Sequence, residues 1–173
     1  MSKLSSKEYS NINSFIARMR SPVKRSTSPI KKNNIDKSEK KYNKLPLFLT
    51  RQGFYICQIK INGVKGFFLL DTGSNSTCID TMDQQKFKMI VNDSSEAVSV
   101  TNTIKINNSV NNLLELAGVK KNNIKLDILD LTNVKQVVED KKIPKISGIL
   151  GNKILNSFKC IIDYNKSSLY IRK

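Results

Sequence analysis

The stretch Phe67–Ser76 constrains the fold of this chain more than any other. Four apolar residues run directly into Asp71, which is followed by a threonine, a glycine and a serine. A buried strand that delivers a carboxylate to a tight loop has this pattern, because apolar surroundings tune the proton affinity of a carboxylate. Gly73 has no Cβ, so the backbone can approach the carboxylate closely. Thr72 and Ser74 can donate hydroxyl hydrogen bonds within the turn.

The sequence Leu-Leu-Asp-Thr-Gly-Ser around Asp71 resembles the active-site signature of aspartic proteases, and a chain with one copy resembles their retropepsin-like branch. A second motif supports the resemblance. Residues 146–151 read Ile-Ser-Gly-Ile-Leu-Gly, similar to the family's apolar-apolar-glycine element, and the helix-like segment 152–158 follows. Two closing strands, at 160–164 and 168–171, are similar to the family's C-terminal end. The resemblance covers about residues 48–173.

The resemblance implies an all-β fold, a single-lobe closed β-barrel of the acid-protease type with one short C-terminal helix. It also implies an aspartic endopeptidase in which Asp71 is the catalytic acid and base. With one such aspartate per chain, two chains form a homodimer, and the two Asp71 carboxylates share one proton and activate a water molecule. The implied supporting residues are Thr72, which packs into the opposite subunit's loop; Gly73 and Ser74, which hold the carboxylate in plane; Ile149 and Leu150, which buttress the loop; and Gly151, which permits close backbone passage.

The family carries a flap, a hairpin that closes over substrate, and the resemblance places it between Val98 and Leu114. The implied cleft residues on its strand are Val100, Thr101, Asn102, Thr103 and Ile104. The asparagines at 107–108 and 111–112 are expected to form its turn, because asparagine tolerates left-handed backbone. Flap tips in this family are usually glycine-rich, yet no glycine lies between Gly73 and Gly118. This departure favours an alternative: a weakly active or inactive dimeric interaction module of the same fold.

Alternating apolar residues predict further strands. Phe54 to Ile61 alternates, with Cys57 and Ile59 on its apolar face, and Asn62-Gly63 is a typical hairpin turn before the strand that ends at Asp71. Further strands are expected at 76–80, 113–116 and 123–131, and short helical segments at 81–89 and 134–140. Asp163 also ends an apolar run, but the Tyr-Asn-Lys that follows indicates an ordinary turn.

The positive charge is concentrated at the N-terminus. Of the net +16, residues 1–45 carry twelve lysines and arginines against three acidic residues. This segment has few apolar residues, so we expect a disordered basic arm at 1–45 and the protease-like domain at 46–173. Within the arm, 5–20 has apolar residues at helical spacing and could form a short helix. Nonspecific contact of the arm with polyanions is a further expectation.

The chain contains no histidine, which excludes Ser-His and Cys-His catalysis within it and the commonest zinc-ligand sets. No cofactor or metal is expected. Cys57, Cys78 and Cys160 lie among apolar residues and are expected to be buried free thiols, as in a reducing compartment. No apolar run is long enough to cross a membrane. We therefore expect an intracellular, cytoplasmic protein (virion-associated if its source is a virus) whose partners are a second copy of itself and a polypeptide substrate.

Overall fold

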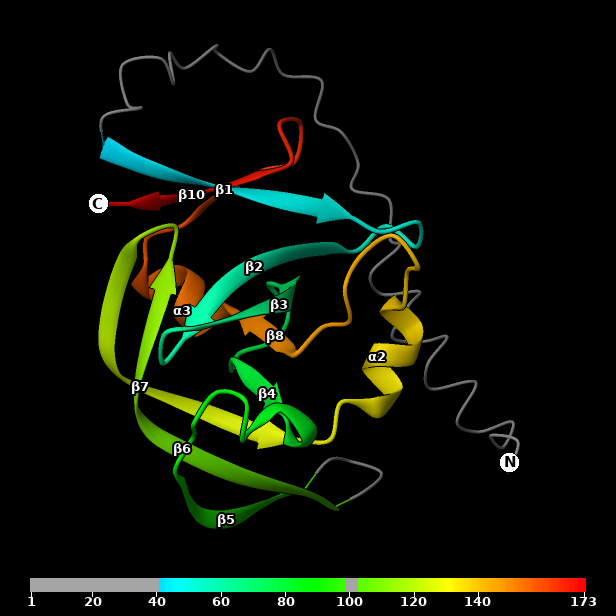
Figure 1. The fold of residues 1–173 in the computed structure, drawn as a ribbon, viewed down its shortest axis with the longest axis vertical. Coiled ribbons are helices and arrows are strands. Elements are labelled where there is room, and N and C mark those ends of the chain that lie inside the picture. The colour runs from blue at the N-terminus through cyan, green and yellow to red at the C-terminus, as the bar shows by residue number, and fades with distance from the viewer. Residues whose placement is uncertain (1–40, 99–102) are drawn as a thin grey trace. The chain divides into compact units, whose positions relative to one another are not determined.

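The computed structural model describes residues 41–98 and 103–173, and for 92–98 and 103–105 it describes the backbone alone. The first forty residues of the predicted arm, with the predicted helix at 5–20, lie outside this range. The described part is built mostly of strands (Figure 1). The strands are β1 (Tyr42–Leu49), β2 (Tyr55–Ile61), β3 (Val64–Asp71), β4 (Cys78–Asp80), β5 (Val91–Val98), β6 (Thr103–Leu116), β7 (Val119–Leu129), β8 (Gly148–Gly151), β9 (Ile161–Asp163) and β10 (Ser168–Arg172).

Helical structure in the described residues is short. The 3-10 turn η3 (Thr81–Asp83) follows β4, α2 (Thr132–Val138) lies between β7 and β8, and α3 (Asn152–Ser157) follows β8 directly. α3 is the predicted C-terminal helix, and α2 matches the predicted helical segment to within two residues. The two helices lie on opposite sides of the barrel in Figure 1.

Six strands close into a barrel. The hydrogen-bonded order runs β6-β7-β4-β8-β3-β2, and β2 also pairs with β6, where Lys60 is opposite Glu115 and Ile61 opposite Leu114. The ring therefore has no free edge between its first and last strands. This confirms the predicted closed all-β barrel.

The hairpin β2–β3 turns at Asn62 and Gly63, both with positive φ (50° and 83°), as a two-residue hairpin turn requires. It leads directly into the strand that carries Asp71. β3 then pairs in parallel with β8, which brings Asp71 opposite Gly151. A parallel pair needs a long crossover connection, and here the intervening chain supplies β4 to β7 and α2.

β1, β10 and β9 form an extension outside the barrel ring. β1 begins at Tyr42, pairs with β10 through Pro46, and then pairs with β2 from Leu47. The regular structure thus starts a few residues before position 46. Asp163 ends β9 and accepts a hydrogen bond from the backbone N–H of Lys166 (3.0 Å), so it serves the predicted turn.

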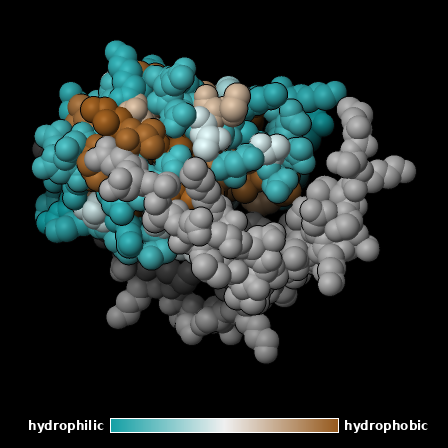
Figure 2. Space-filling view, turned by 90° about the horizontal axis from the view of Figure 1, so that it is seen from below, coloured by the Kyte–Doolittle hydropathy of each residue, from teal (hydrophilic) through white to brown (hydrophobic). Residues whose placement is uncertain are grey.

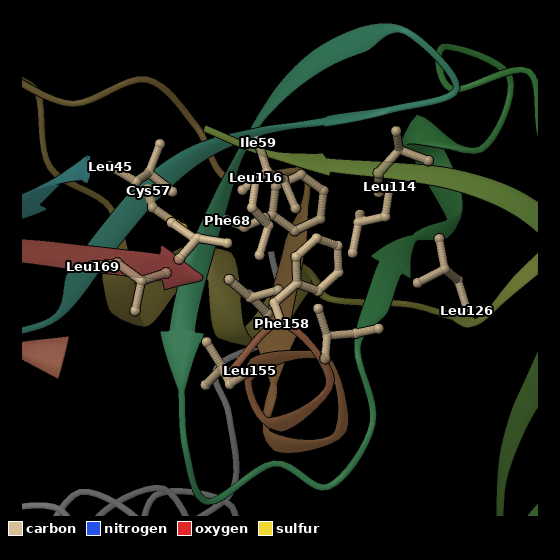
Figure 3. Close-up of a cluster of buried hydrophobic side chains, with 14 of the residues drawn as sticks. Leu45, Cys57, Ile59, Phe68, Leu114, Leu116, Leu126, Leu155, Phe158 and Leu169 are labelled. Atoms are coloured by element: carbon tan, nitrogen blue, oxygen red, sulfur yellow. The ribbon is translucent and has the colours of Figure 1, made fainter. Parts of the chain in front are cut away.

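The barrel interior holds the main apolar core. Along β2 and β3, Cys57, Ile59 and Phe68 point inward, and Phe68 and Phe158 are among its fully buried or nearly buried rings. Figure 3 shows these side chains converging with Leu155 of α3 and leucines of β6 and β7. Burial of the aromatic rings alone is worth roughly 2–3 kcal/mol each. α3 therefore packs against the same core that holds the strand leading to Asp71.

A second apolar cluster lies on the outer face of β2 and β3. Ile56 and Leu69 alternate with the inward-facing residues, are opposite one another in the pairing of β2 with β3, and pack with Val138 and Ile146. The alternation places Ile56 on the face of its strand opposite Cys57 and Ile59, yet Ile56 is only 1 % exposed. The reason is that α2 and the chain after it cover this face.

The flap turn was predicted at the wrong place. The asparagines at 107–108 and 111–112 lie within β6, which pairs with β7, and the chain reverses earlier, because Val98 is opposite Thr103. No single strand runs from Val98 to Ile104, since β5 ends at Val98 and β6 begins at Thr103; Val100, Thr101 and Asn102 lie outside the described residues. Asn111 does adopt left-handed backbone (φ 59°), but it does so at an irregularity in the β6–β7 pairing.

A buried polar network explains why Asn112 stays in a strand. The Asn112 amide is 2 % exposed; its nitrogen donates to the Ile124 carbonyl (3.1 Å), and its oxygen accepts from Asn62 (2.9 Å). Asn62 in turn accepts from the backbone N–H of Leu113 (2.9 Å). These hydrogen bonds satisfy amides that would otherwise favour a turn.

Exposed large apolar side chains are few among the described residues, Met82 and Ile90 being the most exposed (83 % and 77 %). The face in Figure 2 is hydrophilic over most of its described part, with some hydrophobic areas between hydrophilic residues. None of the described helices is both long and apolar enough to cross a membrane.

Candidate active site

Asp71 is the last residue of β3, and a tight loop begins directly after it. The backbone N–H of Gly73 donates to the Asp71 Oδ1 (2.9 Å), and the N–H of Ser74 points to the Asp71 carbonyl (3.3 Å). Asp71 is half-buried, whereas Thr72 and Gly73 are exposed. The loop thus fixes the carboxylate from one side and leaves it accessible from the other.

The start of α3 holds the loop in place. The backbone N–H groups of Asn152 and Lys153 donate to the carbonyls of Ser74 (2.7 Å) and Asn75 (3.1 Å). The Ser74 hydroxyl also donates to the Ser76 carbonyl (2.8 Å). The bonds from Asn152 and Lys153 use the first N–H groups of α3, which have no partner within the helix itself. The two motifs singled out in the sequence therefore meet in space.

Gly151 passes very close to the loop. A Cβ built on it would stand 2.2 Å from the carbonyl oxygen of Ser76, so this position admits only glycine without a shift of the loop backbone. In the β3–β8 pairing Leu150 is opposite Leu70 and is fully buried, and Ile149 is opposite Leu69 and half-buried. The structure thus brings all three expected buttress residues to the strand beside Asp71.

Thr77 belongs to the site and was missed by sequence analysis. It is 3 % exposed, and its hydroxyl oxygen accepts a hydrogen bond of 2.9 Å from the backbone N–H of Gly151. The backbone of the same residue accepts from Asp127 of β7 (3.2 Å). A threonine six positions after Asp71 carries no pattern of its own. Only the polar character of a residue just before the apolar strand β4 could have drawn notice.

Cys78 lies behind the site as a buried thiol. Burial raises the pKa of Cys78 to about 12, and the nearby carboxylates of Asp127, Asp71 and Asp80 act in the same direction. A thiol with so high a pKa is neutral at physiological pH and is a poor nucleophile or metal ligand. Cys78 therefore contributes an uncharged, apolar side chain to the buried surroundings of the site. Among the described residues, no cluster of three or more aspartate, glutamate or cysteine side chains is placed to hold a metal ion.

The expected cleft residues fall at the end of the β5–β6 hairpin. Val100, Thr101 and Asn102 lie outside the described residues. Thr103 and Ile104 begin β6, where they are opposite Val98 and Ala97. The role of all five as cleft residues stays a prediction.

Comparison with known proteins gives one family and a set of similar folds. The sequence model of the aspartyl protease family matches residues 57–154, more than half of the chain. Comparison with curated protein sequences gives no match.

Two solved structures share the fold at low sequence identity. The retroviral protease-like domain of Ddi1 from Leishmania major has 16 % identity and a TM-score of 0.50, over 67 % of this chain and 86 % of that one. A retropepsin-like aspartic protease from Rickettsia conorii has 20 % identity and a TM-score of 0.50, over 75 % and 90 %. The matched span 57–154 runs from β2 to the start of α3 and so includes both the Asp71 loop and the Gly151 strand that supports it. The chain therefore belongs to the aspartyl protease family and has the retropepsin-like fold.

Proposed function

We propose that this chain is an aspartic endopeptidase whose active species is a homodimer with one Asp71 from each chain. The observation that carries the proposal is the geometry of the Asp71 loop, in which the Gly73 N–H holds Oδ1 (2.9 Å) and α3 holds the loop backbone. Membership of the aspartyl protease family supports a peptide hydrolase. Retropepsin-like proteases are commonly homodimers, which supports the second chain.

The chemistry follows from two carboxylates brought close together. Like charges a few ångströms apart repel, so the second carboxyl ionises only at higher pH and the pair holds one proton at mildly acidic pH. The ionised Asp71 takes a proton from a water molecule as that water attacks the peptide carbonyl carbon. The protonated Asp71 of the other chain donates a hydrogen bond to the carbonyl oxygen and stabilises the charge that develops there.

The exposed part of the loop suits a contact between chains. Thr72 is exposed in the single chain, directly beside the carboxylate. In the proposed dimer it packs into the partner's loop, and the twofold axis passes between the two aspartates. Gly73 and Ser74 keep the carboxylates in plane, and Ile149, Leu150 and Gly151 support each loop from behind. The β5–β6 hairpin is the proposed flap.

The direct test is cleavage of a peptide library by the parent chain and by Asp71→Asn, over pH 3 to 9. Asparagine keeps the shape but cannot act as a base, so cleavage should fall by at least about 100-fold. The parent should peak at mildly acidic pH, where the pair holds one proton, and lose activity in alkali as both ionise. Undiminished cleavage by the folded variant would contradict the assignment of Asp71. A folded dimer that cleaves no peptide would favour the binding-module alternative.

A mixing experiment tests whether the site is shared. If two chains contribute one dyad, adding an equal amount of Asp71→Asn leaves a quarter of all dimers with two intact aspartates. Activity at constant parent concentration should then fall to about half once the chains have exchanged. Unchanged activity would show that a single chain is sufficient.

A further inference from the structure

The strands β1 and β10 pair side by side outside the barrel ring (Figure 1). One side of this pair is fixed by the main apolar core, in which Leu45, Leu169 and Ile171 are buried. Because side chains alternate along a strand, the residues between these three lie on the other side. They form an outer face, here called the β1–β10 face: Tyr42, Lys44, Tyr170 and Arg172.

The register of the two strands arranges these four residues in a square. Tyr42 is opposite Arg172, and Lys44 is opposite Tyr170. Directly opposite side chains of an antiparallel pair share a face, and diagonal neighbours are roughly 7–8 Å apart. The two tyrosines therefore occupy one diagonal and the two cations the other. The tyrosines are half-buried, whereas both cations are exposed.

The third strand, β9, adds apolar surface to the β1–β10 face. Ile161 is opposite Tyr170 and is 48 % exposed, so an accessible apolar side chain lies beside the second tyrosine. Within the three described strands, Asp163 is the one acidic residue, and its carboxylate accepts the backbone N–H of Lys166 in the turn after β9 (3.0 Å). The face thus combines aromatic and aliphatic surface with positive charge.

The cations here are not neutralised by the part of the chain that the structure describes. Neither Lys44 nor Arg172 forms an ion pair with a described carboxylate. The backbone N–H of Lys173 donates to the Lys41 carbonyl (3.0 Å), so two more exposed lysines lie where β1 begins. The forty residues before Lys41 add ten lysines and arginines against three acidic residues. The charge therefore favours an anionic partner.

An anionic partner that also stacks on aromatic rings is a single-stranded nucleic acid. Its phosphates pair with lysine and arginine, and its unpaired bases stack on tyrosine rings. A duplex keeps its bases within its own stack, and an acidic peptide offers carboxylates without flat rings. In other folds, sheet faces that carry aromatic residues bind unpaired bases in this way. The diagonal of the β1–β10 face offers two such rings.

This face is remote from the candidate active site. Leu69, two positions before Asp71, is opposite Ile56 of β2, which in turn is opposite Phe48 of β1. Tyr42 lies six positions before Phe48, or roughly 20 Å along the strand at 3.3 Å per residue. A nucleic acid bound on the β1–β10 face would therefore leave the Asp71 loop accessible.

We propose that the β1–β10 face binds single-stranded nucleic acid, with bases stacked on Tyr42 and Tyr170 and phosphates held by Lys44 and Arg172. This binding activity is separate from peptide hydrolysis and does not depend on Asp71. It also differs from nonspecific attraction of a basic segment to polyanions, because it requires unpaired bases and a folded surface. The positive charge of residues 1–40 adds affinity for any polyanion, without preference for unpaired bases.

The test is fluorescence anisotropy of the full chain with a labelled single-stranded oligothymidylate of about twelve nucleotides. Tyr42→Leu and Tyr170→Leu keep an apolar side chain but remove the ring, so each should weaken binding at least about fivefold. Tyr42→Phe and Tyr170→Phe keep the ring and should bind within about twofold of the parent. Thermal melting checks that each variant folds.

The salt dependence of binding tests the phosphate contacts. Lys44→Gln and Arg172→Gln each remove one contact, so the slope of log affinity against log salt concentration should become shallower by about 0.7 in each. The matched controls are Tyr164→Leu, an exposed tyrosine in the turn after β9, and Lys65→Gln, an exposed lysine of β3. Both should bind like the parent, and so should Asp71→Asn. Every variant retains residues 1–40, so a difference between variants arises in the folded domain.

Weaker binding by the leucine variants, with binding retained by the phenylalanine variants, supports the inference. Equal binding of the oligothymidylate, a DNA duplex and polyglutamate by the parent overturns it, because only charge would then be recognised. Leucine variants that bind like the parent, or a loss that is as large in the two controls, also overturn it. If a leucine variant fails to fold, unchanged salt slopes in the two glutamine variants overturn it instead.

Sedimentation of the parent and the leucine variants tests a different occupant of this face. If the leucine variants dissociate into monomers where the parent is a dimer, a second copy of the chain covers the face, and the inference is overturned. An unchanged oligomeric state, together with weaker binding of the oligothymidylate, supports it. Neither result depends on whether the chain cleaves peptides.

Discussion

The backbone N–H of Gly151 donates a hydrogen bond of 2.9 Å to the hydroxyl oxygen of Thr77, two residues that are 74 positions apart in the sequence. Gly151 is also the residue opposite Asp71 in the pairing of β3 with β8. The hydroxyl of Thr77 therefore ties together both ends of the Asp71 loop. The position of the carboxylate depends on a residue that does not touch it.

Thr77→Val tests this tie. Valine keeps the shape but leaves the Gly151 N–H buried without an acceptor, which should lower the free energy of unfolding by about 1–3 kcal/mol. A small displacement of Asp71 should lower kcat by up to about 100-fold and change KM less. Urea denaturation and peptide-cleavage kinetics measure the two effects. Thr77→Ser retains the hydroxyl and should restore most of both; a serine variant as defective as the valine variant would show that the methyl group matters instead.

The ion pair of Lys135 with Asp80 should hold α2 to the barrel. Asp80 is 1 % exposed, so Lys135→Met leaves a buried carboxylate without its cation and should cost roughly 3 kcal/mol of unfolding free energy. Lys60→Met is the matched control, because the ion pair of Lys60 with Glu115 is of similar length (2.7 Å) but more exposed to solvent. That variant should cost less than about 1 kcal/mol. Equal losses in chemical denaturation would contradict the assigned role of Asp80.

Asp140 should make the free energy of unfolding depend on pH in the acidic range. The backbone N–H groups of Lys142 and Arg51 lower the pKa of Asp140 in the folded chain. A carboxyl group with a lowered folded pKa stabilises the fold above its unfolded pKa, near 4, and that contribution is lost as pH falls through the folded value. Unfolding free energy measured from pH 6 to pH 2.5 should therefore fall less steeply in Asp140→Asn than in the parent. An identical slope in the two proteins would contradict this.

The three cysteines should react slowly in the native protein. Burial raises the pKa of Cys57, Cys78 and Cys160 to about 12. At pH 8 about one such thiol in ten thousand is ionised, so alkylation followed by mass spectrometry should find little product unless urea is added. Because the unfolded chain releases these protons from about pH 8.5, stability should also fall as pH rises above that value. Cys160, the one half-buried thiol of the three, should react first; equal rates in native and unfolded protein would refute the burial.

The sequence pattern was sufficient to predict the structure where local chemistry and tertiary packing favour the same conformation. The alternation in β2, the Asn62-Gly63 turn and the apolar run into Asp71 each have one low-energy solution, and the structure adopts it. The closed barrel followed from the resemblance, because the β2–β6 pairing that closes it joins residues more than fifty positions apart. No pattern of neighbouring residues predicts that pairing.

The errors arose where tertiary contacts override local preference. Asn112 favours a turn when considered alone, but hydrogen bonds from Asn62 and to Ile124 make a buried strand position favourable. The burial of Ile56, on the face opposite Cys57 and Ile59, could not be foreseen from β2 alone, because Val138 of α2 contributes the cover. Thr77 was missed for the same reason, since its partner is a backbone N–H contributed by a distant strand.

The parallel register of Asp71 with Gly151 also has a consequence for biosynthesis. Ribosomes add residues from the N-terminus, so the Asp71 loop is complete long before the residues that support it, eighty positions later, exist. Until β8 and the start of α3 have left the ribosome, the loop has neither its strand partner nor the N–H groups of Asn152 and Lys153. A nascent chain therefore carries the aspartate without the arrangement that would position it, and the candidate catalytic centre is assembled only after residues 148–153 have been synthesised.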